Sequence, residues 1–250
     1  MDEVTFNKYS PEELMAVIIS REVRNGENVA LGSASPIPAA GCILAEQLHA
    51  PQATIMILDS DAYYPFSGGS SELHFMAQRG ELDLFFLSGI QIDRRGNINL
   101  HVIGDYDAPK RRMPGAYGSA MLYYMAHRVI LSRAEHTRRT LVEKVDFITA
   151  PGVTPPNVYR EGGPTLLVTP KARFDWETAK NEWVLASVHG GWSVADVEAN
   201  TGFPVTTRSP VGETPPPTPQ ELEALRTVVK EKLMKIYPDF AERQILPLKQ

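Results

Sequence analysis

The chain has 250 residues, of which 43% are hydrophobic and 22% charged, which is close to the globular average and excludes disordered, coiled-coil and collagen-like classes. Twenty-five Lys and Arg against 30 Asp and Glu give a formal charge of −5 without a basic stripe, so we expect no nucleic-acid partner. Cys42 is the single cysteine, the N-terminus is acidic, and no run of about 18 apolar residues occurs, so we expect a cytoplasmic chain without disulfide, metal cluster or membrane partner.

The N-terminal part of the chain predicts helices and buried strands in alternation. Ser10, Pro11 and Glu13 form a capping pattern, and the helix that they begin is expected to end at Asn25-Gly26. The elements predicted next are a strand at residues 29–32, a helix at 36–48, a strand at 53–58, a short helix at 71–79 and a strand at 82–87.

The rest of the chain continues this alternation. Further strands are predicted at residues 97–103, 128–131, 147–148, 165–169 and 183–188. The pattern predicts an α/β fold with an open, largely parallel sheet and helices on both faces. A proline-rich linker at 213–220 precedes an amphipathic helix at about 221–236. We expect an α/β domain at 1–212 and a C-terminal segment at 213–250 that packs on the domain or on a partner.

The first candidate site follows the strand at 53–58, because α/β sheets bind ligands at the carboxyl ends of their strands. Two carboxylates there could share a proton and act as general acid or base. Alternatively, they accept hydrogen bonds from loop amides. The catalytic candidates are Asp59 and Asp61, and the substrate-binding candidates around them are Leu58, Ser60, Tyr63 and Tyr64.

A second candidate segment follows the strand at 82–87. Gly89 would let a substrate approach the backbone, and Gln91 is the other candidate substrate-binding residue of this segment. The alternative is a strand-turn-strand hairpin in which Asp93 and Asn97 are turn residues.

A third candidate is the glycine-containing loop ahead of an apolar helical segment. Gly115, Tyr117, Gly118 and Ser119 are its candidate substrate-binding residues, because glycines at a helix start expose N–H groups that can bind an oxyanion. A tight loop without a ligand is the alternative.

The histidines lack the mutual spacing of metal ligands. For His101, His127, His136 and His189, we expect surface positions or hydrogen-bonded core positions.

Several segments together resemble the β-type subunit of family I CoA-transferases. Their order and spacing resemble those of the β-type chain of glutaconate CoA-transferase. They are residues 13–17, 25–26, 50–51, 75–77, 91–99, 103–106, 144–152 and 198–203. The resemblance implies the CoA-transferase-like open α/β fold and an active site shared with an α-type partner chain, in a heterotetramer with two chains of each type. It also implies an acyl-CoA substrate, so that coenzyme A is part of the substrate and no separate cofactor is expected.

The chain departs from that family at the residues that carry the chemistry. The resemblance places Leu58 where the transferases have a glutamate nucleophile, and a leucine cannot attack a thioester. Tyr117 stands where the family has a glycine. Both departures resemble two branches of this fold: steroid ring-cleaving acyl-CoA hydrolases of the IpdAB type and methylglutaconyl-CoA decarboxylases. For the hydrolase branch, the resemblance implies that the α-type partner supplies the catalytic base.

Three functions follow as hypotheses. The first is a β-type chain that helps to hydrolyse or cleave a C–C bond of a CoA thioester. The second is a CoA-transferase that moves CoA between carboxylic acids, with Asp59 as nucleophile. The third is a non-catalytic chain that binds acyl-CoA.

Overall fold

The computed structural model describes residues 9–248. The chain divides into two compact units, the first made of Met1–Ser67 and Pro215–Gln250 and the second of Gly68–Thr214. The first unit therefore combines an N-terminal and a C-terminal part of the sequence. Each unit is described by itself below.

The first unit begins with an alternation of helices and strands. Its elements are α1 (Pro11–Ser20), β1 (Asn28–Leu31), α2 (Pro36–Leu48), β2 (Thr54–Ile57) and the short 3-10 helix η1 (Asp61–Tyr63). Strands β1 and β2 pair in parallel, with Val29 opposite Ile55. The predicted helix is correct at its start, but it ends at Ser20 because the amides of Glu22 and Val23 bond three residues back and tighten the chain into turns.

Helices α1 and α2 pack closely at a glycine. A Cβ added at Gly41 would lie 2.5 Å from Ile19 Cγ2 and 2.7 Å from the Ala16 carbonyl oxygen, so only glycine permits this approach. Most side chains of both helices are buried, including Met15, Ile43 and Leu44. The apolar faces of α1 and α2 therefore form much of the core of this unit.

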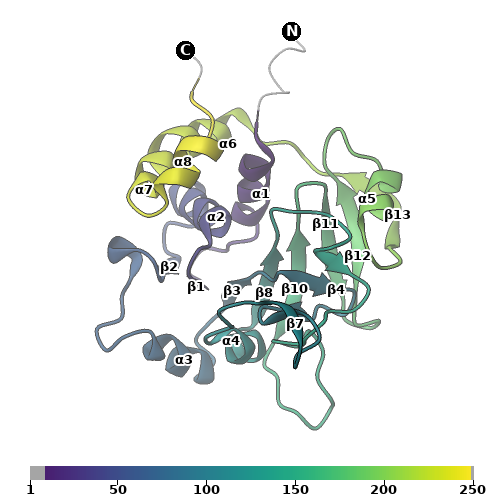
Figure 1. Ribbon diagram of the computed structural model, residues 1–250. Helices are drawn as coiled ribbons and strands as arrows, with labels where there is room; N and C mark the ends of the chain where they lie inside the picture. Colours follow the sequence, from purple (N-terminus) through teal and green to yellow (C-terminus); the bar gives the residue numbers. More distant parts are fainter. Residues whose placement is uncertain (1–8, 249–250) are drawn as a thin grey trace. The chain divides into compact units, whose positions relative to one another are not determined.

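The C-terminal segment returns to this unit as helices. They are α6 (Pro219–Ala224), a π-helical stretch η2 (Leu225–Val229), α7 (Lys230–Met234) and α8 (Pro238–Gln244). Figure 1 shows them in yellow beside α1 and α2, and α6, η2 and α7 contact α2. The amphipathic helix predicted near 221–236 is thus confirmed as a nearly continuous helix from Pro219, where Thr218 and Glu221 form a capping box.

The second unit is built on strands in the order β13-β12-β11-β10-β8-β3. Their bounds are β3 (Leu84–Leu87), β8 (Arg128–Ser132), β10 (Gly163–Val168), β11 (Ala172–Glu177), β12 (Glu182–Val188) and β13 (Thr206–Glu213). The pairs β3–β8, β8–β10 and β12–β13 are parallel, whereas β10–β11 and β11–β12 are antiparallel. Asn181, at a φ of 52°, lies in the tight turn that reverses the chain between β11 and β12. The α/β class with largely parallel pairing is confirmed.

Two small sheets belong to the same unit. One has the order β5-β4-β9, with β4 (Gln91–Asp93), β5 (Ile98–Asn99) and β9 (Leu141–Val142), and the other pairs β6 (Val102–Gly104) with β7 (Pro109–Arg112).

Two strand predictions fail in this region. The strand predicted at 97–103 is interrupted because the Asn99 side-chain oxygen accepts hydrogen bonds from the amides of His101 and Val102. The strand predicted at 147–148 is wrong, since the Phe147 ring stacks on Tyr106 and only Ala150, further on, forms a bridge.

The helices of the second unit are α3 (Ser71–Gln78), α4 (Ser119–Met125) and α5 (Val194–Asn200). A buried polar cluster lies in this unit as well. Both ring nitrogens of His136 are within 3.0 Å of a threonine hydroxyl, those of Thr169 and Thr201. His189 lies between the Thr214 hydroxyl and the Thr169 carbonyl. The expectation of hydrogen-bonded core positions is therefore confirmed for these two histidines.

Candidate active site

The candidate residues fall in both units, and the group after β2 lies in the first. The chain turns directly after Ile57, whose carbonyl accepts from the Ser60 amide at 3.1 Å. The Ser60 hydroxyl then caps η1 by accepting from the Tyr63 amide at 3.2 Å. Ser60 is buried, so its side chain shapes this loop.

Asp59 is held through one carboxylate oxygen. Its Oδ2 accepts from the Ala34 amide at 2.6 Å and from the Tyr237 hydroxyl at 2.8 Å. Its Oδ1 makes no hydrogen bond within residues 9–248, and the residue is exposed. Burial, and then the hydrogen bond to Asp59, raise the pKa of Tyr237, so the phenol stays protonated and donates at neutral pH. One oxygen of Asp59 is thus fixed while the other remains accessible.

The other residues of this turn are held less firmly. Leu58 is half-buried, and its amide donates to the Leu31 carbonyl at 3.4 Å. Asp61 is exposed, and its carboxylate bonds to no side chain or backbone group in the described part of the chain. The Tyr64 ring meets Phe66 edge to face, with 5.4 Å between ring centroids. The structure therefore separates the two carboxylates: Asp59 is anchored and Asp61 is not.

Tyr63 belongs to a three-residue polar cluster with Glu46 and Lys232. The Tyr63 hydroxyl donates to Glu46 Oε2 at 2.8 Å, and Lys232 Nζ donates to the same oxygen at 2.8 Å and to Tyr63 Oη at 2.9 Å. Burial opposes ionisation of Glu46, but the hydrogen bonds from Lys232 and Tyr63 outweigh it and lower the pKa of this carboxyl. Burial raises the pKa of Tyr63, and Glu46 adds to the rise while Lys232 opposes it. The cluster therefore pairs a carboxylate with an ammonium group around a neutral phenol.

Gly89 and Gln91 lie in the second unit, where packing explains both. A Cβ at Gly89 would lie 2.6 Å from the Gln91 carbonyl oxygen, so the glycine permits a close backbone approach. The Gln91 side chain is buried, donates to Asp146 at 3.1 Å, and accepts from the Asn99 side chain at 2.7 Å and the Asp146 amide at 2.9 Å. Both the nitrogen and the oxygen of the Gln91 side-chain amide are thus hydrogen-bonded to other parts of the chain.

The turn after Gln91 is the hairpin named as the alternative for this segment. Strands β4 and β5 pair in antiparallel, and the Asp93 carboxylate accepts from the amides of Arg95 and Asn97 and from the Asn97 side chain. Because Arg95 and Asn97 donate to the buried carboxylate of Asp93, hydrogen bonds within the turn account for its polar residues.

The loop from Gly115 to Ser119 also lies in the second unit. Gly115 has a φ of 106° and Tyr117 a φ of 46°, and Tyr117 is 78% exposed with its hydroxyl against that of Ser70. A Cβ at Gly118 would collide with His74 Nε2. The Ser119 amide already donates to the Ala116 carbonyl at 2.9 Å, so it is not a free donor for an oxyanion.

Sequence reasoning missed the residues that hold the loop after β2. Ala34, Glu46, Lys232 and Tyr237 were not identified, and Tyr237 lies 178 positions from Asp59. The sequence carries no local signal for these contacts, since an amphipathic helix pattern predicts burial and not a polar partner. Within residues 9–248 no group of three or more His, Cys, Asp and Glu side chains could hold a metal ion, and no helix is long and apolar enough to cross a bilayer.

Known proteins resemble this chain over most of its length. It is 33% identical over 246 residues to the β-type chain of 3-oxoadipate CoA-transferase from Pseudomonas knackmussii, covering 88% of this chain and 93% of that protein. It is 30% identical over 149 residues to the cholesterol ring-cleaving hydrolase IpdB subunit of Rhodococcus jostii, covering 58% of each.

Solved structures share the fold. Glutaconate CoA-transferase from Acidaminococcus fermentans superposes with a TM-score of 0.81 at 24% identity, over 97% of this chain and 100% of that chain. The decarboxylase AibA/AibB superposes with a TM-score of 0.78 at 22% identity, over 95% and 99% respectively. At these identities the likeness establishes the fold alone.

The family itself is established by sequence. The family model described as Coenzyme A transferase matches residues 57–200, a range that begins at the last residue of β2 and includes Asp59 and the Gly115–Ser119 loop. The expected resemblance is thereby confirmed, and this chain belongs to the family I coenzyme A transferases as one of their β-type chains.

Proposed function

We propose that this chain is the β-type half of a two-subunit enzyme that hydrolyses or cleaves a C–C bond in an acyl-CoA thioester. The observation that carries the proposal is the carboxylate of Asp59, which is anchored through Oδ2 and leaves Oδ1 accessible. Leu58, which the family resemblance aligns with the transferase glutamate, has no nucleophilic group. A fixed carboxylate with one accessible oxygen is suited to general base catalysis.

The proposed reaction uses the thioester as an electron sink. Asp59 takes a proton from a water molecule while the oxygen of that water adds to a keto carbonyl of the acyl group. The C–C bond next to that carbonyl then breaks, and its electron pair moves to the carbon beside the thioester, where it is delocalised as an enolate. The proton on Asp59 returns to this carbon, which leaves the carboxylate ready for another cycle. In a decarboxylation the same enolate forms as carbon dioxide leaves.

The remaining candidate residues are proposed in smaller roles. Asp61 is a second acid or base candidate beside Asp59, and Leu58, Tyr63 and Tyr64 would form a surface against the acyl group. For the second unit we make a separate proposal, that the loop Gly115–Ser119 contacts a substrate. The proposed partner is an α-type chain. The names of the relatives support this partner, because each relative is one chain of a two-chain enzyme.

A second function is favoured by the 33% identity to a CoA-transferase chain over 88% of this one. In this function the Asp59 carboxylate attacks the thioester carbonyl and the CoA thiolate leaves, giving a mixed anhydride. The thiolate then attacks the aspartyl carbonyl, releasing the carboxylic acid and forming an aspartyl-CoA thioester. An incoming carboxylate reverses these steps and takes the CoA.

Mass spectrometry of the products separates these functions. The two-subunit complex is mixed with a panel of dicarboxylic and cyclic keto-acyl-CoA thioesters, with and without acetate. The proposal expects a change in the acyl group without acetate, by addition of water or loss of carbon dioxide, with CoA retained. Turnover only with acetate, giving acetyl-CoA, would overturn it in favour of transfer, and binding without turnover would show a non-catalytic chain.

A trapping experiment tests the transfer function directly. Hydroxylamine or borohydride reacts with an activated aspartyl group, so a modified Asp59 after incubation with acyl-CoA would support transfer. An unmodified Asp59 in a complex that turns over would exclude it.

A further inference from the structure

The C-terminal helices contact both ends of the loop from Asp59 to Tyr63. Tyr237, at the start of α8, donates to Asp59 at the first residue of the loop. Lys232, in α7, donates to Tyr63 at its last residue and to Glu46 on α2. One short stretch, residues 232–237, therefore holds the loop at two points, and all of these residues belong to the first unit.

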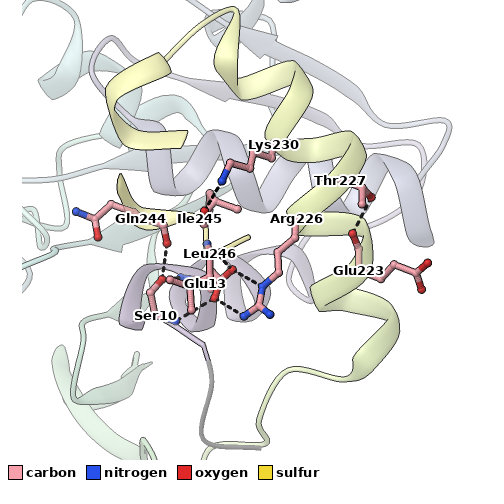
Figure 2. Close-up of polar contacts among 9 residues, drawn as sticks. All are labelled: Ser10, Glu13, Glu223, Arg226, Thr227, Lys230, Gln244, Ile245 and Leu246. Atoms are coloured by element: carbon pink, nitrogen blue, oxygen red, sulfur yellow. Dashed lines mark hydrogen bonds and ion pairs between the residues drawn. The ribbon is translucent and has the colours of Figure 1, made fainter. Parts of the chain in front are cut away.

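The C-terminal segment that carries this stretch contacts α1 on either side of it, through Arg226 and Leu246. Figure 2 shows Arg226 against the buried carboxylate of Glu13, at 2.8 and 2.9 Å, and Lys230 donating to the Ile245 carbonyl at 2.6 Å. The Leu246 amide also donates to Glu13, at 3.1 Å. Tyr237 is held in turn by the hydrogen bond from its amide to the Leu233 carbonyl at 2.7 Å. The residues that contact the loop thus belong to helices that are themselves held by an ion pair and by hydrogen bonds.

We propose that Tyr237 and Lys232 are positioning residues that fix the Asp59–Tyr63 loop so that Oδ1 of Asp59 faces the substrate. The proposal rests on the function proposed above. Tyr237 engages Oδ2 together with the Ala34 amide, so the carboxylate cannot rotate to exchange its two oxygens without losing two hydrogen bonds. The C-terminal segment would then support catalysis without touching the substrate.

The kinetic test uses Tyr237→Phe in the two-subunit complex, with an acyl-CoA that the panel identifies as a substrate. Loss of the hydroxyl should lower kcat about tenfold and change KM less than twofold. Lys232→Met should lower kcat in the same direction, and Lys232→Arg should restore part of it.

Thr227→Val is the matched control. It removes one hydroxyl hydrogen bond, to the Glu223 carbonyl within the same helical segment, and Thr227 is exposed (Figure 2). Its kcat and KM should equal those of the unchanged protein. A Tyr237→Phe variant with unchanged kcat, beside an inactive Asp59→Asn variant, would overturn the positioning role.

Hydrogen–deuterium exchange tests the contacts without relying on activity. The amides of Leu58, Ser60 and Tyr63 are hydrogen-bonded within the unit, so they should exchange several-fold faster in Tyr237→Phe and in Lys232→Met than in Thr227→Val. Equal exchange in all three variants would overturn the proposal. Faster exchange together with full activity of Asp59→Asn would overturn the proposed function and leave the loop contacts established.

Discussion

Glu13 on α1 is fully buried and binds Arg226 of the C-terminal helices through both carboxylate oxygens. The residues are 213 positions apart. The same carboxylate also accepts from the Ser10 amide, at 2.9 Å, and from the Leu246 amide. It therefore takes part in the cap of α1, in an ion pair and in a contact with the segment after α8. Hydrogen bonding to Glu13 raises the pKa of Arg226, which keeps the guanidinium charged.

We expect Glu13→Gln to lower the free energy of unfolding by about 3–5 kcal/mol, because it removes the buried carboxylate charge that pairs with the Arg226 guanidinium. Denaturant unfolding monitored by circular dichroism would measure the change. Lys235→Met is the control, since Lys235 pairs with Glu231 at an exposed position and such pairs contribute about 0–1 kcal/mol. Equal stabilities of the two variants would show that the buried pair does not hold the C-terminal segment.

The buried histidines make stability depend on pH. Burial lowers the pKa of His136 to about 4, with Lys171 and His189 contributing, and burial lowers the pKa of His189 to about 4 as well. The unfolded histidines titrate near 6.5, so the unfolded state takes up protons at a higher pH than the folded state. The stabilising contribution is therefore complete above about pH 6.5 and is lost as the pH falls toward 4.

Denaturant unfolding at pH 7, 6, 5 and 4 would measure this dependence. We expect a loss of several kcal/mol between pH 6.5 and 4, of which roughly 3 kcal/mol comes from each histidine. In His136→Gln the protein would be less stable at pH 7, but the slope over this range should be smaller. An unchanged slope would mean that other groups carry the pH dependence.

The sequence predicted elements and caps well, because both depend on neighbouring residues. Ser10 and Glu13 do form a capping box, and β1, α2, β2, α3 and β3 lie within a few residues of their predicted ranges. Contacts between distant segments were not predictable in the same way. Nothing near Glu13 indicates Arg226, and nothing near Asp59 indicates Tyr237, since each pair meets only after the C-terminal helices have packed.

The candidate segments illustrate the same limit. Gly89 and Gln91 were predicted as substrate-binding residues, with a hairpin as the alternative for their segment, and only the contacts of Gln91 and Asp93 show that the hairpin forms. Asp59 and Asp61 are equivalent in sequence, two carboxylates after a strand. The structure distinguishes them because Ala34 and Tyr237 anchor Asp59.

We expect Asp59→Asn to lower kcat at least tenfold, about 1.4 kcal/mol of barrier, because an amide cannot accept the proton that the carboxylate takes. Asp61→Asn should have a smaller effect, since no described residue fixes the Asp61 carboxylate. Steady-state kinetics of the two-subunit complex would measure both. Full activity in both variants would place the base on the partner chain.

Tyr117 tests the loop of the second unit. It has a φ of 46° and is 78% exposed, so Tyr117→Gly removes little packing and relieves a backbone conformation that glycine adopts at lower cost. We expect unchanged or slightly raised stability together with an altered preference among acyl-CoA substrates, measured as ratios of kcat/KM. Tyr117→Phe is the control, because it removes only the hydroxyl that contacts Ser70. If Tyr117→Gly keeps every ratio within twofold, the loop does not contact the acyl group, and the acyl preference must then be set by residues elsewhere.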